Sequence, residues 1–410
     1  KDKCRVCNTS NLDEIISLGN QYLVNFLDSE NQHIPSAPLD LVLCNKNNGG
    51  CGLLQLKHTV SNETLYRQFW YKSGVNQTMI DALSDITSNA ENLVKLNPHD
   101  IVIDIGANDG TLLRSYKNKE LQLVGFEPAT NLIDFTKVGT NCIINDFFNY
   151  AIFEENFPGR KAKIITSIAM FYDLEDPNQF VCDVVKSLDT DGVWIIQMNY
   201  LTTMLDNNAF DNIVHEHLEY YSLNSLEELL KLHDLEIFDV ELNKVNGGSI
   251  RTYIKHKNCN IFPISLKVTE QRQYEDNLEL DTIKPYLEFT NRIKKLKEQT
   301  LTFIKNEIEN GKKIYIYGAS TRGNVLLQFY GIDSNLISYA VDRNPMKWGK
   351  KIAGTNIIII SEEQARKDNP DYFFVLPWYF LDEFKNRENI FLKNGGKFIV
   401  PLPEFKIISI

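Results

Sequence analysis

The pattern of apolar and polar positions changes character near residue 100. The segment DIVIDIGANDGTLLRSY, which begins at residue 100, combines a β-branched apolar run, a glycine turn and a helical pattern. Three further apolar runs follow at 122–128, 162–170 and 192–201, and helical stretches separate them. Short apolar strands that alternate with helices are typical of an α/β domain with a mostly parallel sheet.

A second unit of the same kind lies further along the chain. Residues 280–310 carry apolar side chains at helical spacing and precede Gly311, which predicts a linking helix with a glycine stop. A strand, a turn and a helix are predicted in KKIYIYGASTRGNVLLQFYG at 312–331, and further strands follow at 337–345 and 372–378. The pattern therefore predicts a second, smaller doubly wound domain.

The first seventy residues differ from both units, because they are rich in Asn and Gly and show little helical periodicity. They resemble a small module that a ligand must hold together. A chain of 410 residues is expected to form two or three domains. We expect the small module at 1–70, a central α/β domain at 71–280, and the linking helix with a Rossmann-like domain at 281–410.

Composition narrows the class of protein. The formal net charge of −11 argues against a nucleic-acid partner, which selects a basic surface. No apolar run approaches the ~20 residues that span a bilayer, and the start KDKCRVCNTS lacks the apolar core of a signal peptide. We therefore expect a cytoplasmic protein without a membrane partner. Its seven cysteines are then expected to be reduced thiols or metal ligands.

Four of these cysteines lie in the small module. Cys4 and Cys7 form C-x2-C, a spacing at which one tight turn presents two thiolates to a tetrahedral zinc ion. Cys44 and Cys51 enclose six residues that include two glycines, which allow a looped turn. Four cysteines would close the coordination shell, so the predicted zinc is structural. A set of buried free cysteines is the alternative.

The glycine turn near residue 106 predicts a cofactor site. Asp104, Gly106 and Gly110 form D-x-G-x-x-x-G between a strand and a helix, where the backbone can approach a ligand closely. The dinucleotide pattern G-x-G-x-x-G is not matched, because Asn108 occupies the second glycine position. Glu127 ends the next predicted strand, where a carboxylate can bind two ribose hydroxyls. Together these residues favour S-adenosylmethionine over a plain structural turn.

A second pair of residues extends this prediction. Asp146 and Phe147 lie where an adenine could stack on an aromatic ring and meet a carboxylate. They could equally be ordinary loop and core residues.

A second glycine turn, YGASTRGN, contains Gly318 and Gly323 after a good strand. A tight turn without a ligand is one interpretation, and a site for part of a nucleotide-bearing substrate is the other. Arg322 and Lys347 could then bind phosphate, although each could also be a solvated charge.

The stretch FDNIVHEHLEYYS at 210–222 holds two of the seven histidines. His215, Glu216 and His217 do not match the H-E-x-x-H spacing of zinc enzymes. A polar loop is one interpretation of the cluster. We favour proton chemistry, because a histidine beside a carboxylate and phenols can take up a proton near neutral pH. The cluster also follows a predicted strand, at the edge of the sheet where such folds bind ligands.

In this order, the motifs resemble those of nucleotide-sugar C-methyltransferases. The resemblance joins the four cysteines, D-x-G-x-x-x-G, HEH, NGGS at 246–249 and the later GAS-x-x-GN, and it covers essentially the whole chain. It implies a small zinc module, a class I S-adenosylmethionine-dependent methyltransferase domain and a C-terminal Rossmann-like α/β domain. The implied substrate is a dTDP- or GDP-linked 4-keto-6-deoxysugar, methylated at C3, or at C5 in some members.

The resemblance also implies roles for individual residues. His217 corresponds to the proposed base and Glu216 to the carboxylate beside it, while His215 is less certain and could only shape the loop. The family's Y-x-S-G element matches Tyr71, Ser73 and Gly74, near the cofactor and the sugar.

Two departures separate this chain from several members of the family. Val214 stands where they have a tyrosine, and Phe171 and Tyr172 stand where some have a histidine.

A mechanism follows from these assignments. His217 would remove the C3 proton beside a C4 ketone, and the resulting enolate would attack the sulfonium methyl group. Candidates for the donor to the enolate oxygen are Tyr220, Tyr221 and Tyr71. Candidates for binding the sugar and its phosphates are Asn199, the backbone groups of Asn246, Gly247 and Gly248, and the side chains of Arg322 and Lys347.

Three alternatives stay open. An O- or N-methyltransferase needs a base but no enolate. An NAD-dependent sugar oxidoreductase would use the YGASTRGN turn. The third alternative is a zinc-module adaptor with an inactive methyltransferase fold, and the intact cofactor motif of this chain argues against it. The oligomeric state is open, and a monomer is compatible with the sequence.

Overall fold

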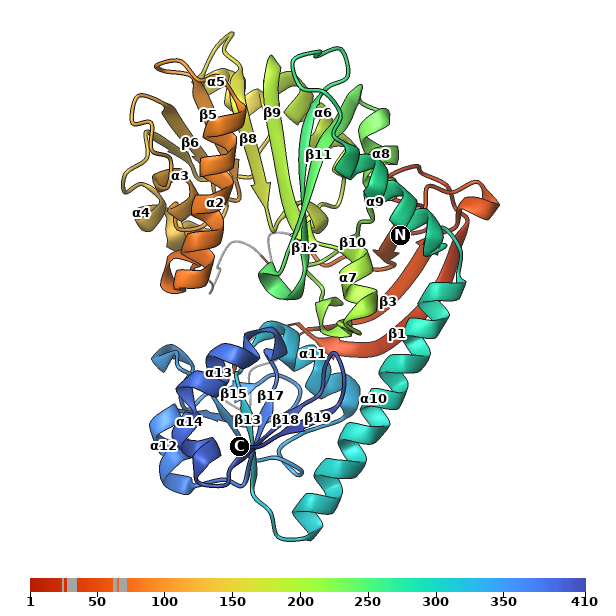
Figure 1. Cartoon of the computed structure of the whole chain (residues 1–410), viewed down its shortest axis with the longest axis vertical. Coiled ribbons are helices and arrows are strands. Elements are labelled where there is room, and N and C mark those ends of the chain that lie inside the picture. Colours follow the sequence, from red (N-terminus) through yellow and green to blue (C-terminus); the bar gives the residue numbers. More distant parts are fainter. Residues whose placement is uncertain (24–25, 28–34, 62–64, 66–71) are drawn as a thin grey trace.

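The computed structural model describes residues 1–23, 26–27, 35–61, 65 and 72–410. The strands form three β-sheets, and a long helix, α10 (Lys284–Glu309), leads from the second to the third (Figure 1). The helix spans the predicted linking segment and ends just before Gly311, which has a φ of +78°. Tyr71, one of the candidate residues, lies outside the described residues.

The first sheet is antiparallel and contains the cysteine module. Its order is β1 (Leu12–Tyr22), β3 (Ser36–Cys44), β4 (Leu54–Leu56) and β10 (Glu219–Tyr220). The last of these strands comes from the stretch that follows HEH, so this stretch is hydrogen-bonded to the module. Leu56 donates its backbone N–H to Leu218 at 2.9 Å, which extends the pairing.

The second sheet has seven strands and carries the cofactor turn. Its order is β11 (Leu235–Asn243), β12 (Ser249–His256), β9 (Leu188–Asn199), β8 (Ala162–Ile168), β5 (Ile101–Ile105), β6 (Gln122–Phe126) and β7 (Cys142–Ile144). The pairs from β9 to β7 are parallel, whereas β12 and β11 pair antiparallel. The near-continuous apolar runs of β5 and β8 are explained by burial of both sheet faces.

Two apolar clusters cover the faces of this sheet. One cluster joins β5 to α2 (Gln77–Leu93) and α3 (Thr111–Arg114) through side chains such as Val102, Ile86 and Leu113. The other joins the opposite face to α6 (Pro177–Ser187) and α8 (Leu223–Lys231) through side chains such as Trp194 and Leu226. The remaining helices of this part are α4 (Ile133–Thr136), α5 (Tyr150–Asn156), α7 (Leu201–Asp206) and α9 (Leu266–Asn277).

The third sheet has the doubly wound pattern that the sequence predicts. Its order is β19 (Lys406–Ile408), β18 (Lys397–Val400), β17 (Tyr372–Val375), β13 (Ile314–Tyr317), β14 (Tyr339–Val341), β16 (Ile358–Ile360), β15 (Lys351–Ile352) and β2 (Phe26–Leu27). The helices of this domain are α11 (Thr321–Tyr330), α12 (Glu362–Asp368), α13 (Leu381–Arg387) and α14 (Asn389–Lys393). The five strands from β18 to β16 run parallel.

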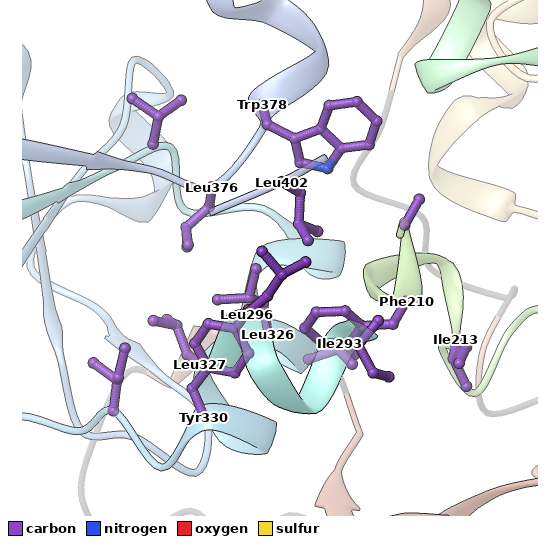
Figure 2. Close-up of a cluster of buried hydrophobic side chains, with 14 of the residues drawn as sticks. Phe210, Ile213, Ile293, Leu296, Leu326, Leu327, Tyr330, Leu376, Trp378 and Leu402 are labelled. Atoms are coloured by element: carbon purple, nitrogen blue, oxygen red, sulfur yellow. The ribbon is translucent and has the colours of Figure 1, made fainter. Parts of the chain in front are cut away.

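The three sheets interlock rather than follow the boundaries expected at residues 70 and 280. Strand β2 of the first seventy residues joins the edge of the third sheet by pairing with β15, and β10 joins the first sheet. One apolar cluster contains side chains from the cysteine module, α10 and the third sheet, together with Phe210 and Ile213 of the stretch before HEH (Figure 2). None of the helices that the structure describes is long and apolar enough to cross a membrane.

Candidate active site

The four module cysteines form a compact cluster. Their sulfur atoms all lie within 4.8 Å of one another, with 3.6 Å between Cys4 and Cys51 and 3.4 Å between Cys7 and Cys44. Tetrahedral zinc with bonds of ~2.3 Å places its sulfur ligands about 3.8 Å apart, so the cluster fits the ion. Cys4 and Cys7 precede β1, Cys44 ends β3 and Cys51 follows it, and these two strands pair with each other.

The glycine-rich loop shapes the second half of this cluster. A Cβ atom at Gly50 would lie 2.6 Å from the Cys44 sulfur, so only glycine fits there. The backbone N–H of Cys51 donates to the Cys44 sulfur at 3.3 Å. The contacts with Cys4 and Cys44, followed by burial, raise the pKa of Cys51 far above its ordinary value. Thiolates this close together need a cation between them, which supports a metal rather than free thiols.

The predicted cofactor turn follows β5 as the sequence indicates. Gly106 and Gly110 have φ values of +74° and +78°, and Asn108 also adopts a positive φ of +52°. The backbone N–H of Asn108 donates to Glu127 Oε2 at 2.7 Å, and the N–H of Ala129 donates to Oε1 at 2.7 Å. Both oxygens of Glu127 are therefore held in place at the end of β6, beside the glycine turn.

The two carboxyl groups of this site are buried. Burial raises the pKa of Asp104 to about 7, against the hydrogen bond that Thr166 donates at 2.6 Å, and Glu127 raises it further. Burial likewise raises the pKa of Glu127 to about 7, against the hydrogen bonds from the N–H groups of Ala129 and Asn108. Perturbed carboxyl groups at the end of parallel strands are typical of a ligand site.

The segment that precedes α2 closes over this turn. Ser73 donates its backbone N–H to Asn108 Oδ1 at 3.0 Å, and Gly74 donates to Asp109 Oδ2 at 2.8 Å. A Cβ atom at Gly74 would lie 2.8 Å from Thr111 Oγ1, so glycine permits the close approach. The structure thus brings Ser73 and Gly74 to the cofactor turn.

Asp146 and Phe147 lie beyond β7, one strand further along the sheet edge. Phe147 is partly exposed, whereas Phe148 is buried and packs edge-on against Phe126 with ring centroids 5.0 Å apart. Asn145 donates to the Glu127 carbonyl at 2.8 Å, which ties this loop to the glycine turn. Phe147 is consequently the more accessible of the two neighbouring rings.

The HEH cluster forms a turn between the 3-10 helix η5 (Phe210–Asn212) and β10, and its two histidines contact different partners. His215 is buried, and its Nε2 lies 3.0 Å from the Ala37 carbonyl oxygen of β3. The Nδ1 atom of His217 lies 2.9 Å from the Asn212 carbonyl oxygen. A carbonyl only accepts hydrogen bonds, so Nδ1 of His217 carries the proton and Nε2 keeps its lone pair.

A small cavity adjoins His217. Its lining includes Tyr172, Asn199, Tyr200, Asn212, His217 and Tyr220. The Tyr172 ring meets the His217 ring edge-on with centroids 4.4 Å apart, and the Tyr220 hydroxyl donates to the Asn212 carbonyl oxygen at 3.4 Å. Asn199 donates from its side-chain amide to Asn212 Oδ1 at 3.0 Å. The structure thus brings His217, Tyr220 and Asn199 together.

Tyr221 lies in different surroundings from Tyr220. Neighbouring strand residues point to opposite faces. Tyr221 is fully buried, and its ring centroid lies 5.4 Å from that of Phe171. Burial raises the pKa of Tyr221, and the charges of Glu219 and Cys4 raise it further. The expectation that Tyr221 reaches a substrate is therefore not supported by its position.

The protonation states of the cluster follow from burial. Burial lowers the pKa of His217 to about 3, against the hydrogen bond to Asn212, and the charge of Arg322 lowers it further. His217 is consequently neutral near pH 7, and its burial makes it a weaker base than an ordinary histidine. Burial raises the pKa of the adjacent Glu216.

The NGGS loop differs from the expectation that it offers backbone donors to a sugar. The N–H groups of Gly247 and Gly248 donate to Lys244 and Val245 within their own turn, at 3.3 and 3.0 Å. The Asn246 carbonyl accepts from Arg322 at 2.8 Å. A Cβ atom at Gly247 would lie 3.2 Å from Trp378, so this glycine permits close packing against the C-terminal domain.

Arg322 and Lys347 also differ from the expectation of phosphate binding. Arg322 donates from Nε to Asp211 Oδ2 at 3.0 Å and is stacked over the Tyr379 ring at 4.5 Å. Lys347 donates to the Ala319 carbonyl at 2.8 Å and to Asp342 Oδ2 at 3.1 Å. Both cations are occupied by partners within the chain.

The second glycine turn has the geometry of a packing turn. A Cβ atom at Gly318 would lie 2.6 Å from Pro377, and one at Gly323 would lie 2.7 Å from Leu376. Asp342, at the end of β14, is the carboxylate that would meet a ribose in a dinucleotide fold. Its oxygens already accept from Ala319, Asn344 and Lys347. These contacts give an NAD site at this turn no support.

Sequence reasoning left three residues of the cavity region without a role. Tyr172 lies in the 3-10 helix η4 (Phe171–Asp173), shortly after β8, so the rule that ligands bind at the ends of parallel strands could have pointed to it. Asn212 acts through its carbonyl group and Asp211 through a partner 111 residues away. No sequence pattern reveals either of these contacts.

Family models match the chain in three consecutive parts. They are a zinc binding domain at residues 4–66, a methyltransferase domain at 76–240 and a C-methyltransferase C-terminal domain at 244–403. The C-methyltransferase NovU of Streptomyces niveus is 30% identical over 412 residues, which cover 100% of this chain and 97% of NovU. The match therefore extends over all three parts.

Solved methyltransferase structures resemble part of the chain. The plantazolicin methyltransferase BpumL in complex with SAH is 13% identical, covers 42% of this chain and 82% of its own, and gives a TM-score of 0.34. An S-adenosylmethionine-dependent methyltransferase from Clostridium acetobutylicum is 17% identical, covers 43% and 91%, and gives 0.33.

The family of this chain is assigned from its identity to NovU and from the order of the family models, and not from these solved structures. The zinc binding model covers the cysteine cluster, so Cys4, Cys7, Cys44 and Cys51 form a structural zinc site. The methyltransferase model covers the glycine turn and Glu127, where the residues present fit S-adenosylmethionine. This chain belongs to the family of S-adenosylmethionine-dependent C-methyltransferases.

Proposed function

We propose that this enzyme methylates a carbon atom beside the C4 ketone of a nucleotide-linked 4-keto-6-deoxysugar. The target is C3, with C5 as the alternative, because both carbons lie next to the ketone. The nucleotide carrier is dTDP or GDP. The observation that supports the proposal is the position of His217, which lines a small cavity while the Asn212 carbonyl holds its Nδ1 atom.

Carbon methylation requires such a base. A carbon atom is a poor nucleophile until a neighbouring carbonyl group allows its proton to be removed. His217 Nε2 takes this proton, the electron pair of the C–H bond becomes the C=C bond of an enolate, and the negative charge collects on O4. General-base assistance of this kind contributes typically ~10²–10⁴ in rate.

S-adenosylmethionine supplies an electrophilic methyl group, which the enolate carbon accepts as the S–CH3 bond breaks. Glu127 would hold the ribose hydroxyls, and the backbone around Gly106 and Asn108 would lie along the cofactor. Phe147 and Asp146 are the candidates for contact with the adenine. Ser73 and Gly74, which bond to Asn108 and Asp109, would cover the cofactor on the side of the substrate.

The charge on the enolate oxygen needs a donor. Tyr220 and Tyr172 line the cavity beside His217, and we assign the donor to these two hydroxyls. Val214 is buried with 1% of its surface exposed, so it contributes packing rather than a polar contact. Preorganised donors aimed at a developing oxyanion are worth ~10²–10³ in rate. Glu216 beside His217 would compensate the positive charge that forms on the imidazole.

A panel assay tests the substrate. The enzyme is incubated with dTDP- and GDP-linked 4-keto-6-deoxysugars and ¹³C-methyl-labelled S-adenosylmethionine, and NMR locates the new methyl group. A methyl group on C3 or C5 is expected. Methylation at oxygen or nitrogen would favour the O- or N-methyltransferase interpretation instead.

A second assay tests the base. In D2O without methyl donor, the wild-type enzyme should exchange the proton at the target carbon, and His217→Asn should lose this exchange. His217→Asn should still bind S-adenosylmethionine with unchanged affinity. His256→Asn, at the end of β12, is the matched control and should exchange normally. Exchange at the wild-type rate in His217→Asn would show that His217 is not the base.

A further inference from the structure

The segment that leads into HEH is packed against the C-terminal domain. Phe210 and Ile213 belong to one buried cluster with side chains of α10 and α11, and Ile213 lies at its edge (Figure 2). The Phe210 ring is stacked on Tyr330, with centroids 5.6 Å apart, and meets Phe329 edge-on at 5.2 Å. These aromatic contacts hold Phe210, on the N-terminal side of Asp211, and Ile213, on its C-terminal side, belongs to the same buried cluster.

Asp211 forms a buried polar contact with the same domain. Its side chain is 1% exposed, and its Oδ2 atom lies 2.8 Å from the Arg322 NH2 nitrogen and 3.0 Å from Nε. The indole N–H of Trp378 donates to the same oxygen at 3.2 Å. Arg322, with 11% of its side chain exposed, also donates to the Asn246 carbonyl at 2.8 Å. The arginine thus joins the segment before HEH to the NGGS loop.

This contact leads directly to the imidazole of His217. The residue after Asp211 is Asn212, whose carbonyl oxygen holds Nδ1 of His217 at 2.9 Å. The same carbonyl accepts from Tyr220 at 3.4 Å, and the Asn212 side chain accepts from Asn199 at 3.0 Å. A rotation of the peptide at Asp211 would therefore move the atom that selects the His217 tautomer.

We propose that the C-terminal domain positions the catalytic histidine, and that Arg322 is the positioning residue which acts through Asp211 and the Asn212 carbonyl. The inference rests on the proposed function, because it assumes that His217 is the base. It gives the C-terminal domain a role in catalysis that requires no ligand at the YGASTRGN turn. It also replaces the expected contact of Arg322 with substrate phosphate.

Geometry explains why an arginine is needed. Its planar fork reaches Asp211 through Nε and NH2 while NH1 bonds to the Asn246 carbonyl and the plane stacks on Tyr379. A lysine provides one point charge and cannot make these contacts together. Arg322→Lys should therefore retain only part of the function, and Arg322→Met should lose it.

The test uses the whole 410-residue chain and, besides Arg322→Lys, three variants. Arg322→Met and Asp211→Asn break the contact from either side. Arg366→Met is the matched control, because Arg366 pairs with the buried Glu388 at 2.5 Å within the C-terminal domain and does not contact the segment before HEH. The control separates a general loss of stability from a specific effect on catalysis. Rates are expressed per S-adenosylmethionine binding site, which is counted by calorimetric titration.

The first readout is kinetic and uses the sugar nucleotide that is turned over fastest in the panel. Arg322→Met and Asp211→Asn should lower kcat by about 10²-fold, the effect of misplacing a catalytic group by ~1 Å. KM and the Kd for S-adenosylmethionine should stay within about twofold of wild type, because a misplaced base slows the chemical step and leaves ground-state binding intact. Arg366→Met should keep its kcat. An increase in KM with unchanged kcat would overturn the inference and show that Arg322 binds substrate.

The second readout requires no substrate. In ¹⁵N-histidine-labelled enzyme, long-range ¹H–¹⁵N NMR distinguishes the two tautomers of each ring. His217 should be an Nδ1–H tautomer in the wild type and in Arg366→Met, and a mixture in Arg322→Met. An unchanged tautomer together with unchanged kcat in Arg322→Met would refute the positioning role. If His217→Asn were active, the proposed base would fail whatever the Arg322 variants show.

Discussion

The carboxyl group of Glu127 makes cofactor binding depend on pH. Each Glu127 oxygen accepts one backbone N–H, from Asn108 and Ala129, at 2.7 Å, and burial raises its pKa to about 7. Two ribose hydroxyls bind best to the ionised form, because a carboxylate offers only acceptor sites. Below the pKa the group carries a proton and loses part of this capacity. The affinity for S-adenosylmethionine should therefore fall as the pH is lowered through 7.

The size of this effect follows from the pKa. A group with a pKa of about 7 is ionised to about 90% at pH 8 and about 10% at pH 6. If only the ionised form binds, the Kd should rise about tenfold from pH 8 to pH 6, which corresponds to ~1.4 kcal/mol. Glu127→Gln should bind about 10–100-fold more weakly at pH 8, because its amide cannot accept from both N–H groups and lacks the charge.

Calorimetric titration with S-adenosylmethionine at pH 6, 7 and 8 measures both effects. The Kd of Glu127→Gln should be independent of pH over this range, while Glu155→Gln, which replaces an exposed carboxyl group on α5, should behave as wild type. A wild-type Kd that does not change with pH would refute the reasoning. A pH dependence that persists in Glu127→Gln would assign the titration to Asp104, whose pKa is also about 7.

Two further predictions concern stability. Metal analysis should find one zinc ion per chain, and Cys44→Ser should lose the ion and melt at least about 5 °C lower. Cys182→Ser, outside the cluster, should keep the zinc ion and the melting temperature of the wild type. A normal melting temperature without zinc would contradict the structural role. Gly248→Ala should lower the free energy of unfolding in urea by about 2 kcal/mol or more, because φ is +127° and a Cβ atom would lie 1.9 Å from Thr203 Cγ2. Gly395→Ala, with φ +92° and open space around it, isolates the backbone strain, and an equal loss in both variants would exclude the clash as the cause.

The predictions that were confirmed depend on local patterns in the sequence. A strand, a glycine turn and a helix are contiguous in the chain, so Gly106, Gly110 and Glu127 could be placed at one sheet edge from spacing alone. The α/β fold, the zinc module and the methyltransferase family are confirmed by the matching family models and by NovU. The four cysteines are the clearest case, because C-x2-C is itself the geometry of a zinc ligand pair.

Other predictions concern groups with several possible partners. Gly247, Gly248, Arg322 and Lys347 were expected to face a substrate, and in the structure each bonds or packs within the chain. A charge or a free N–H in a sequence shows a capacity to bind, but a closer partner from another element takes precedence. For Arg322 that partner is a buried carboxylate, which would be costly to leave without a cation.

The sequence by itself determined which residue types are available for the chemistry and in which order the three parts follow. It determined that HEH lies after the strand that ends near Asn199, because this order is a property of the chain. Only the tertiary structure decided that His215 bonds to the Ala37 carbonyl while His217 bonds to Asn212 and faces the cavity. The physical reason is that Ala37 belongs to the first sheet and Asn199 to the second, and only the packing of these sheets places both residues beside HEH.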